Sequence, residues 1–173
     1  MSHPHHAQTQ RAGLAEELPA ARRSMPDLLR SDEFCRSLLE KARWPDGPVC
    51  ANCGATGQAS KLATRPGLWT CRACRRCQFS VTSGTPLHRT RLPVAHWVRL
   101  FSMIEVSGVS LTISQVSRRF DVAHLTAENM LKRLEELKRE MPETAMRLDV
   151  LLRELALSRK PAAPLAAPGQ NVT

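Results

Sequence analysis

The fold of this chain depends on residues 50–77, CANCGATGQASKLATRPGLWTCRACRRC. This stretch contains five cysteines, which are Cys50, Cys53, Cys71, Cys74 and Cys77. Two CxxC pairs separated by 15–20 residues are the usual sequence signal of a structural zinc site, because each CxxC turn directs two thiolates at one point. The sequence therefore predicts a small zinc ribbon of short antiparallel strands.

The second pair of ligands has two possible registers. Pairing Cys71 with Cys74 leaves seventeen residues after the first pair, and pairing Cys74 with Cys77 leaves twenty, so the spacing permits both. We favour Cys71 and Cys74, because Cys77 then begins an alternating strand in which it shares one face with Phe79 and Val81. In either register four thiolates fill the coordination shell of one Zn²⁺ ion, which is therefore predicted to be structural.

The positive charge of the chain is concentrated on the segment that holds the cysteines. The formal net charge is +9. Residues 41–99 hold ten Lys and Arg against one acidic residue, whereas the rest of the chain holds fifteen of each sign. A concentrated positive field suits a polyanion such as nucleic acid. The alternative is that Arg72, Arg75 and Arg76 only offset the negative charge of a four-thiolate zinc centre, although both roles are compatible.

Periodicity and turn signals predict an α+β chain in which the ribbon lies between helical segments. Helices are expected over 31–43, 93–106, 112–120, 123–140 and 143–157, and strands over 59–64, 67–71 and 77–82. The expected organisation is a disordered tail (1–25), a helix (26–43), the ribbon (44–90), a helical domain (91–140), a last helix (141–158) and a disordered tail (159–173). Ser31 is a good N-cap, and Cys35 is expected to be a small buried side chain. The helix over 123–140 is expected to have an apolar face formed in part by Leu125, Leu131, Leu134 and Leu137.

No apolar run approaches the 18 or so residues that cross a bilayer, and the N-terminus lacks the apolar core of a signal peptide. We therefore expect a cytoplasmic, nucleoid-associated protein with no membrane partner. Thiols stay reduced in that compartment, which favours metal binding over disulfides.

Four parts of the chain resemble the N-terminal part of zinc-ribbon insertion-sequence transposases: WPDGPVCANCG (44–54), WTCRACRR (69–76), QFSVTSGTPLHRTRLP (78–93) and the Trp97 that follows. The resemblance extends from about residue 27 to residue 140. It implies that the zinc ligands are Cys50, Cys53, Cys71 and Cys74. In family members, the second cysteine pair is usually followed by two basic residues and then directly by QFSV. Cys77 is therefore one residue more than this pattern has. The extra residue leaves two alternatives open, a local bulge in the strand or a shift of the zinc ligand to Cys77.

Residues 114–134, SQVSRRFDVAHLTAENMLKRL, resemble the helix-turn-helix that follows the ribbon in these transposases. The usual turn glycine is replaced by Asp121, which tolerates the left-handed conformation. The recognition helix is expected to start near Ala123, with an exposed N-terminal end that carries His124, Thr126, Ala127 and Asn129. Asparagine is suited to reading adenine, and His124 or Thr126 to contacting a base edge or a phosphate. The alternative is a plain three-helix domain with solvated polar side chains.

The expected partner is double-stranded DNA, with a related transposase or a second copy of the chain as further candidates. The predicted DNA contacts are Arg72, Arg75, Arg76, His88, Arg89, Arg91, Arg118, Arg119, His124, Thr126, Asn129, Lys132 and Arg133.

Full members of the resembled family continue into a catalytic domain of ribonuclease-H type, which uses three carboxylates and two divalent metals. Only 33 residues follow residue 140, and they read as one leucine-rich helix and a Pro/Ala tail. We therefore expect a DNA-binding protein that is not an enzyme. The alternatives are the end-recognition chain of a split transposase and an adaptor whose ribbon binds protein. The last helix is expected either to cover the helical core, which we favour, or to pair two copies.

Overall fold

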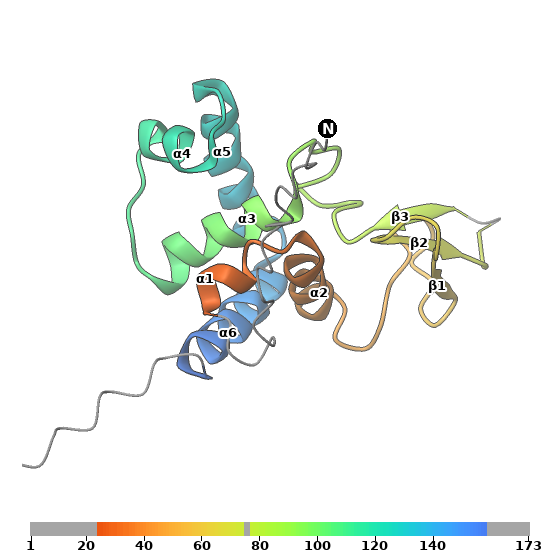
Figure 1. Cartoon of the computed structure of the whole chain (residues 1–173). Helices are drawn as coiled ribbons and strands as arrows, with labels where there is room; N and C mark the ends of the chain where they lie inside the picture. Colours follow the sequence, from red (N-terminus) through yellow and green to blue (C-terminus); the bar gives the residue numbers. More distant parts are fainter. Residues whose placement is uncertain (1–23, 75–76, 159–173) are drawn as a thin grey trace, which may run out of the picture.

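The computed structural model describes residues 24–74 and 77–158 (Figure 1). The elements are α1 (Met25–Leu28), α2 (Asp32–Arg43), β1 (Ala59–Lys61), β2 (Leu68–Cys71), β3 (Gln78–Ser80), α3 (Val94–Phe101), the π-helix η2 (Ser102–Val106), α4 (Ile113–Phe120), α5 (His124–Glu140) and α6 (Pro142–Ser158). The predicted tails lie outside the described residues, apart from Ser24 and Met25 at the start of α1. The mixed architecture of helices and one small antiparallel sheet is confirmed.

The sheet projects from one side of the helical body (Figure 1). Its order is β1-β2-β3, with both pairs antiparallel. Ser60 lies opposite Thr70, and Trp69 lies opposite Phe79. The strands are shorter than predicted, because the chain already turns at Leu62, whose N–H donates to the carbonyl of Leu68.

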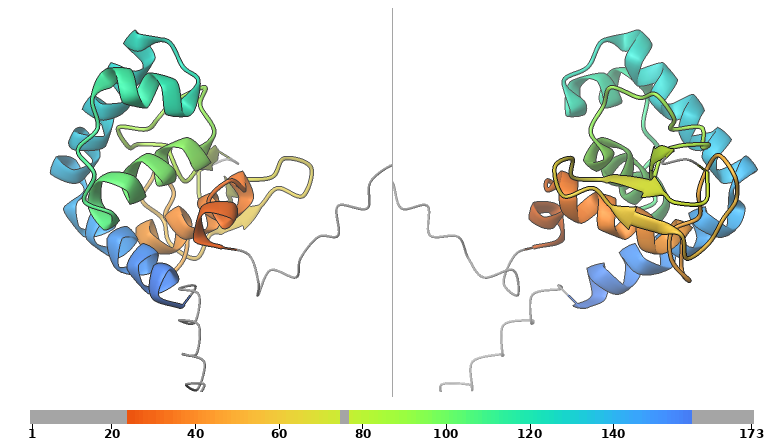
Figure 2. Two further views of the ribbon diagram at one scale, coloured as in Figure 1. Left: turned by 60° about the vertical axis from the view of Figure 1, so that its left-hand side comes forward. Right: turned by 90° about the vertical axis from the view of Figure 1, so that its right-hand side faces the viewer.

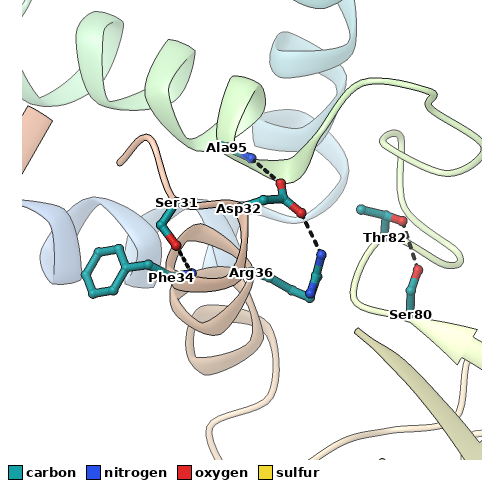
Figure 3. Close-up of polar contacts among 7 residues, drawn as sticks. All are labelled: Ser31, Asp32, Phe34, Arg36, Ser80, Thr82 and Ala95. Atoms are coloured by element: carbon teal, nitrogen blue, oxygen red, sulfur yellow. Dashed lines mark hydrogen bonds and ion pairs between the residues drawn. The ribbon is translucent and has the colours of Figure 1, made fainter. Parts of the chain in front are cut away.

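Helix α2 forms where its capping signals predicted it. The Ser31 hydroxyl accepts a hydrogen bond from the N–H of Phe34 at 3.2 Å, which satisfies one of the free donors of the first turn. The Asp32 carboxylate also accepts a hydrogen bond from the N–H of Ala95 at 2.9 Å and so ties the start of α3 to α2 (Figure 3). The cap matters because α3 has no side-chain cap of its own. Cys35 is fully buried on the core side of α2, as expected.

The helical core lies between α2, α3, α5 and α6. Trp97, Phe101, Leu134 and Leu148 are almost fully buried there. Helix α6 packs against α2, η2 and α5, in agreement with the interpretation that the last helix covers the core. The helix predicted over 93–106 instead changes to a π-helix after Phe101.

The sheet of the ribbon lies beside α2 (Figure 2, right). Aromatic side chains hold the ribbon against the end of this helix. Trp44, directly after α2, packs edge-on against Trp69 and Phe79, with ring centroids 6.1 and 5.8 Å away. The indole N–H of Trp69 donates to Glu40 on α2 at 3.1 Å. Arg43 donates to the carbonyl of Val81. The ribbon therefore has a fixed orientation on the helical body.

Two predictions of side-chain burial are wrong. Leu125 is 69% exposed and Ala127 is fully buried, because the packing of α4 on α5 turns the residues Ala127, Met130, Leu134 and Leu137 inward. Cys77 does not join Phe79 and Val81 in the core: its side chain is half-buried, whereas theirs are buried.

Candidate functional site

The metal centre is formed by two turns at one end of the ribbon. The sulfur atoms of Cys50, Cys53, Cys71 and Cys74 all lie within 4.8 Å of one another. The Sγ atoms of Cys50 and Cys74 are 3.6 Å apart, and those of Cys53 and Cys71 are 3.8 Å apart. A tetrahedron with Zn–S bonds of 2.3 Å has edges of about 3.8 Å. The four cysteines are therefore positioned to hold one structural Zn²⁺ ion.

Local backbone geometry positions the first pair. The N–H of Gly54 donates to the carbonyl of Cys50 at 2.9 Å and closes the first turn. Gly54 has a φ of +71°, which glycine adopts without steric cost. Burial alone would raise the pKa of Cys50, but hydrogen bonds from the N–H groups of Cys53 and Asn52, together with the neighbouring thiols, lower this pKa to about 6. These hydrogen bonds favour the thiolate of Cys50, the form that binds metal. In the same turn, the hydrogen bond from the N–H of Ala55 lowers the pKa of Cys53, but the neighbouring thiols outweigh this hydrogen bond and the pKa is raised.

Cys77 lies outside the group of four sulfurs. Its carbonyl accepts a hydrogen bond from the N–H of Cys71, and its N–H donates to the carbonyl of Cys74. Cys77 therefore extends the pairing of β2 with β3, and the favoured register of the ligands is the one that the structure brings together. Of the predicted arginines beside the site, Arg72 is exposed, and Arg75 and Arg76 lie outside the described residues.

The basic loop after the ribbon lies beside the N-terminal half of α5. An open hollow of about 430 Å³, the α5 hollow, separates the two segments, and its lining includes Arg89, Arg91, Trp97, Thr126, Asn129 and Arg133. The guanidinium of Arg133 donates to the carbonyl of His88 at 3.3 Å and holds the loop against the helix. The structure thus brings six of the predicted contact residues together, although His88 and Arg133 are 45 positions apart in the sequence.

Arg89 has a φ of +56°, a left-handed conformation that is unusual for a residue other than glycine. Such backbone strain gathers at functional sites, where the surroundings hold it in place. The strained residue carries a positive charge into the wall of the α5 hollow.

A tight turn of 121–123 joins α4 to α5. Thr112 and Gln115 form a reciprocal capping box that starts α4. Asp121 ends α4 with a φ of +51°, the left-handed conformation expected in place of a turn glycine. The Ser117 hydroxyl donates to the carbonyl of Val122 at 2.6 Å and fixes the turn. Helix α4 then packs on α5 (Figure 1).

The remaining predicted contacts are not gathered at the hollow. Arg118, His124 and Lys132 are exposed on α4 and α5. Arg119 lines a different pocket, together with Arg30 and Arg99. Neither Arg30 nor Arg99 was among the predicted sites, because each lies far from Arg119 in the sequence and belongs to no motif.

The candidate metal centre lies in the part of the chain that matches a known domain family. Residues 30–77 match the family model described as the transposase zinc-ribbon domain. No curated protein and no solved structure matches the chain. Among the helices of the described ranges 24–74 and 77–158, none is long and apolar enough to cross a bilayer. The family match spans α2 and all four ligands of the metal centre but not α3 to α6, so the chain carries a zinc ribbon of the transposase type followed by helices that no comparison identifies.

Proposed function

We propose that this chain is a zinc-dependent module that binds double-stranded DNA and has no catalytic activity of its own. The observation that carries the proposal is the α5 hollow, in which a basic loop and the polar start of a helix face the same space. The zinc ribbon supports it, because the matching domain belongs to transposases.

In this proposal α4 and α5 are a helix-turn-helix, with α5 as the recognition helix. Asn129 is exposed two turns into α5, beside Arg91 and Arg133 of the same hollow. An asparagine amide can make two hydrogen bonds to adenine in the major groove. The guanidinium groups at either side are suited to the phosphates that flank such a base, which fix position without reading sequence.

The ribbon would give a second contact with the duplex. Trp44 and Glu40 fix its orientation on α2, and Arg72 is exposed next to the zinc ligand Cys71. A DNA-binding protein of this kind works in the cytoplasm, on the nucleoid. Pairing of two copies is a further part of the proposal, since Met146, Val150 and Leu157 leave apolar side chains exposed on α6.

The test is fluorescence anisotropy of the zinc-loaded chain with a random-sequence duplex at several salt concentrations. Each phosphate that the protein neutralises adds about 0.9 to the slope of log affinity against log salt. We expect affinity that falls steeply with salt and is weakened when a chelator removes zinc, because the contact made by the ribbon is then lost. A flat salt response, or absence of binding at low salt with zinc retained, would refute the proposal.

A second candidate is the end-recognition chain of a split transposase, which the family match of the ribbon favours. In that case the chain would bind transposon-end duplex far more tightly than random duplex, and strand cleavage would need a separate catalytic chain. Equal affinity for both duplexes would exclude this candidate and leave general DNA binding.

A further inference from the structure

A second basic site lies on the side of the chain formed by α1, α3 and α4. A pocket of about 300 Å³, the arginine pocket, is lined by Arg30, Arg99, Arg119, Ser102 and Ser107 together with apolar residues of α1 and η2. Arg30 lies just after α1, Arg99 lies on α3 and Arg119 lies on α4. Their convergence depends on the tertiary fold alone.

The charged residues that line this pocket in the part of the chain that the structure describes are all positive. Its lining contains no Asp or Glu, and none of its three arginines forms an ion pair within the described ranges. Elsewhere on the helices Arg36, Arg147 and Arg153 each bind a carboxylate four residues away. Arg99 and Arg119 have no acidic residue at three or four positions to either side. Three like charges around one pocket repel one another, and an anion in the pocket would relieve that repulsion.

The other polar groups of the pocket are hydrogen-bond donors suited to an oxyanion. Ser102 is 5% exposed, and its hydroxyl has no hydrogen-bond partner among residues 24–74 and 77–158. Ser102 also begins the π-helix η2, and Ser107 ends it. Short π-helical turns occur frequently at functional sites. Arg99 is held in place by the ring of Phe120, which lies 5.1 Å from its guanidinium carbon.

We infer that the arginine pocket binds a phosphate group. Guanidinium groups match the geometry of phosphate oxygens, and serine hydroxyls complete the set of donors. The pocket volume of about 300 Å³ leaves ample room for a phosphate group. The phosphate could belong to the DNA backbone, in which case the inference rests on the proposed function, or it could be free in solution.

The first experiment titrates inorganic phosphate into the zinc-loaded full chain at constant ionic strength and follows backbone amides by NMR. Binding at this pocket is expected to shift the amides of Ser102, Ser107 and Arg119. The variants Arg119→Gln and Arg30→Gln replace exposed side chains and are expected to weaken binding at least about tenfold, the loss typical of a hydrogen bond to a charged group. Arg139→Gln is the matched control, because Arg139 is exposed on α5 and pairs only with Glu140.

The second experiment measures the salt slope of duplex binding with the same variants, after thermal unfolding has shown that each is folded. If the phosphate is that of DNA, Arg119→Gln lowers the slope by about 1 and Arg139→Gln does not. Specific binding of inorganic phosphate without any DNA binding would support the inference and refute the proposed function. DNA binding with an unchanged slope, together with no shift on adding inorganic phosphate, would overturn the inference and leave the proposed function standing.

Discussion

Removal of zinc should unfold the ribbon and leave the helical body folded. The ribbon has few buried apolar side chains of its own, chiefly Trp44, Phe79 and Val81. At about 1.5–3 kcal/mol for each buried side chain, they contribute roughly 5–9 kcal/mol. A structural zinc site contributes on the order of 10–16 kcal/mol. Loss of the metal therefore removes half or more of what stabilises the ribbon.

The helical body does not depend on the metal in this way. Trp97 and Leu134 belong to a core that packs between helices, without a ligand of the zinc ion. Hydrogen exchange measured with and without chelator should show lost protection from about residue 49 to residue 82 and retained protection in α3, α5 and α6. The fluorescence of Trp44 and Trp69 should shift to the red, while Trp97 stays buried.

Two cysteine variants provide the matched control. Cys71 is fully buried in the group of four sulfurs, so Cys71→Ser should reproduce the effect of chelator. Cys77 lies outside that group, so Cys77→Ser should retain one zinc ion per chain and normal exchange. If removal of zinc caused equal loss of hydrogen-exchange protection in the ribbon and in α5, the reasoning would be refuted. It would also be refuted if Cys77→Ser lost its zinc while Cys71→Ser retained it.

Three further outcomes are expected. Arg91→Gln should lower the slope of log affinity for DNA against log salt by about 1. Asn129→Ala should reduce the preference for one base at one position of the duplex by about 1–3 kcal/mol, measured by anisotropy with substituted duplexes. If neither quantity changes, the α5 hollow is not the DNA contact. Asp121→Gly should stabilise the fold by about 1 kcal/mol and Asp121→Val destabilise it by about 1–2 kcal/mol in urea unfolding, because only glycine adopts the left-handed turn freely; the opposite order would contradict this. Burial, followed by the charge of Arg99, lowers the pKa of His96, so the unfolded chain binds the proton more readily; stability should therefore fall as pH drops below about 6.5, and His96→Asn should remove that part of the pH dependence.

Local signals in the sequence predicted the elements and the metal centre. Ser31 begins α2 because its hydroxyl satisfies a donor of the first turn, and that interaction involves only neighbouring residues. The metal centre was predicted from spacing for the same reason, since each CxxC turn is a local structure, although spacing alone left two registers open for the second pair. Asp121 was identified as a left-handed turn from its residue type and place between two helical patterns.

Features that depend on tertiary packing were not predicted. The burial of Ala127 in place of Leu125 reflects how α4 lies on α5, which the periodicity of one helix does not define. The meeting of Arg30, Arg99 and Arg119 depends on three elements far apart in the chain. Cys77 shared a strand pattern with Phe79, but Phe79 packs against Trp44 and is buried, whereas Cys77 is half-buried.

The packing of α6 on α2 has a consequence for synthesis on the ribosome. Arg147 of α6 donates to the carbonyl of Ala42 at 2.7 Å, across 105 residues of sequence. Until α6 has been translated, the apolar face of α2 lacks part of its cover. At 5–20 residues per second, this interval lasts about 5–20 seconds. A nascent chain stalled before α6 would therefore present an incomplete core, which makes it a substrate for chaperones.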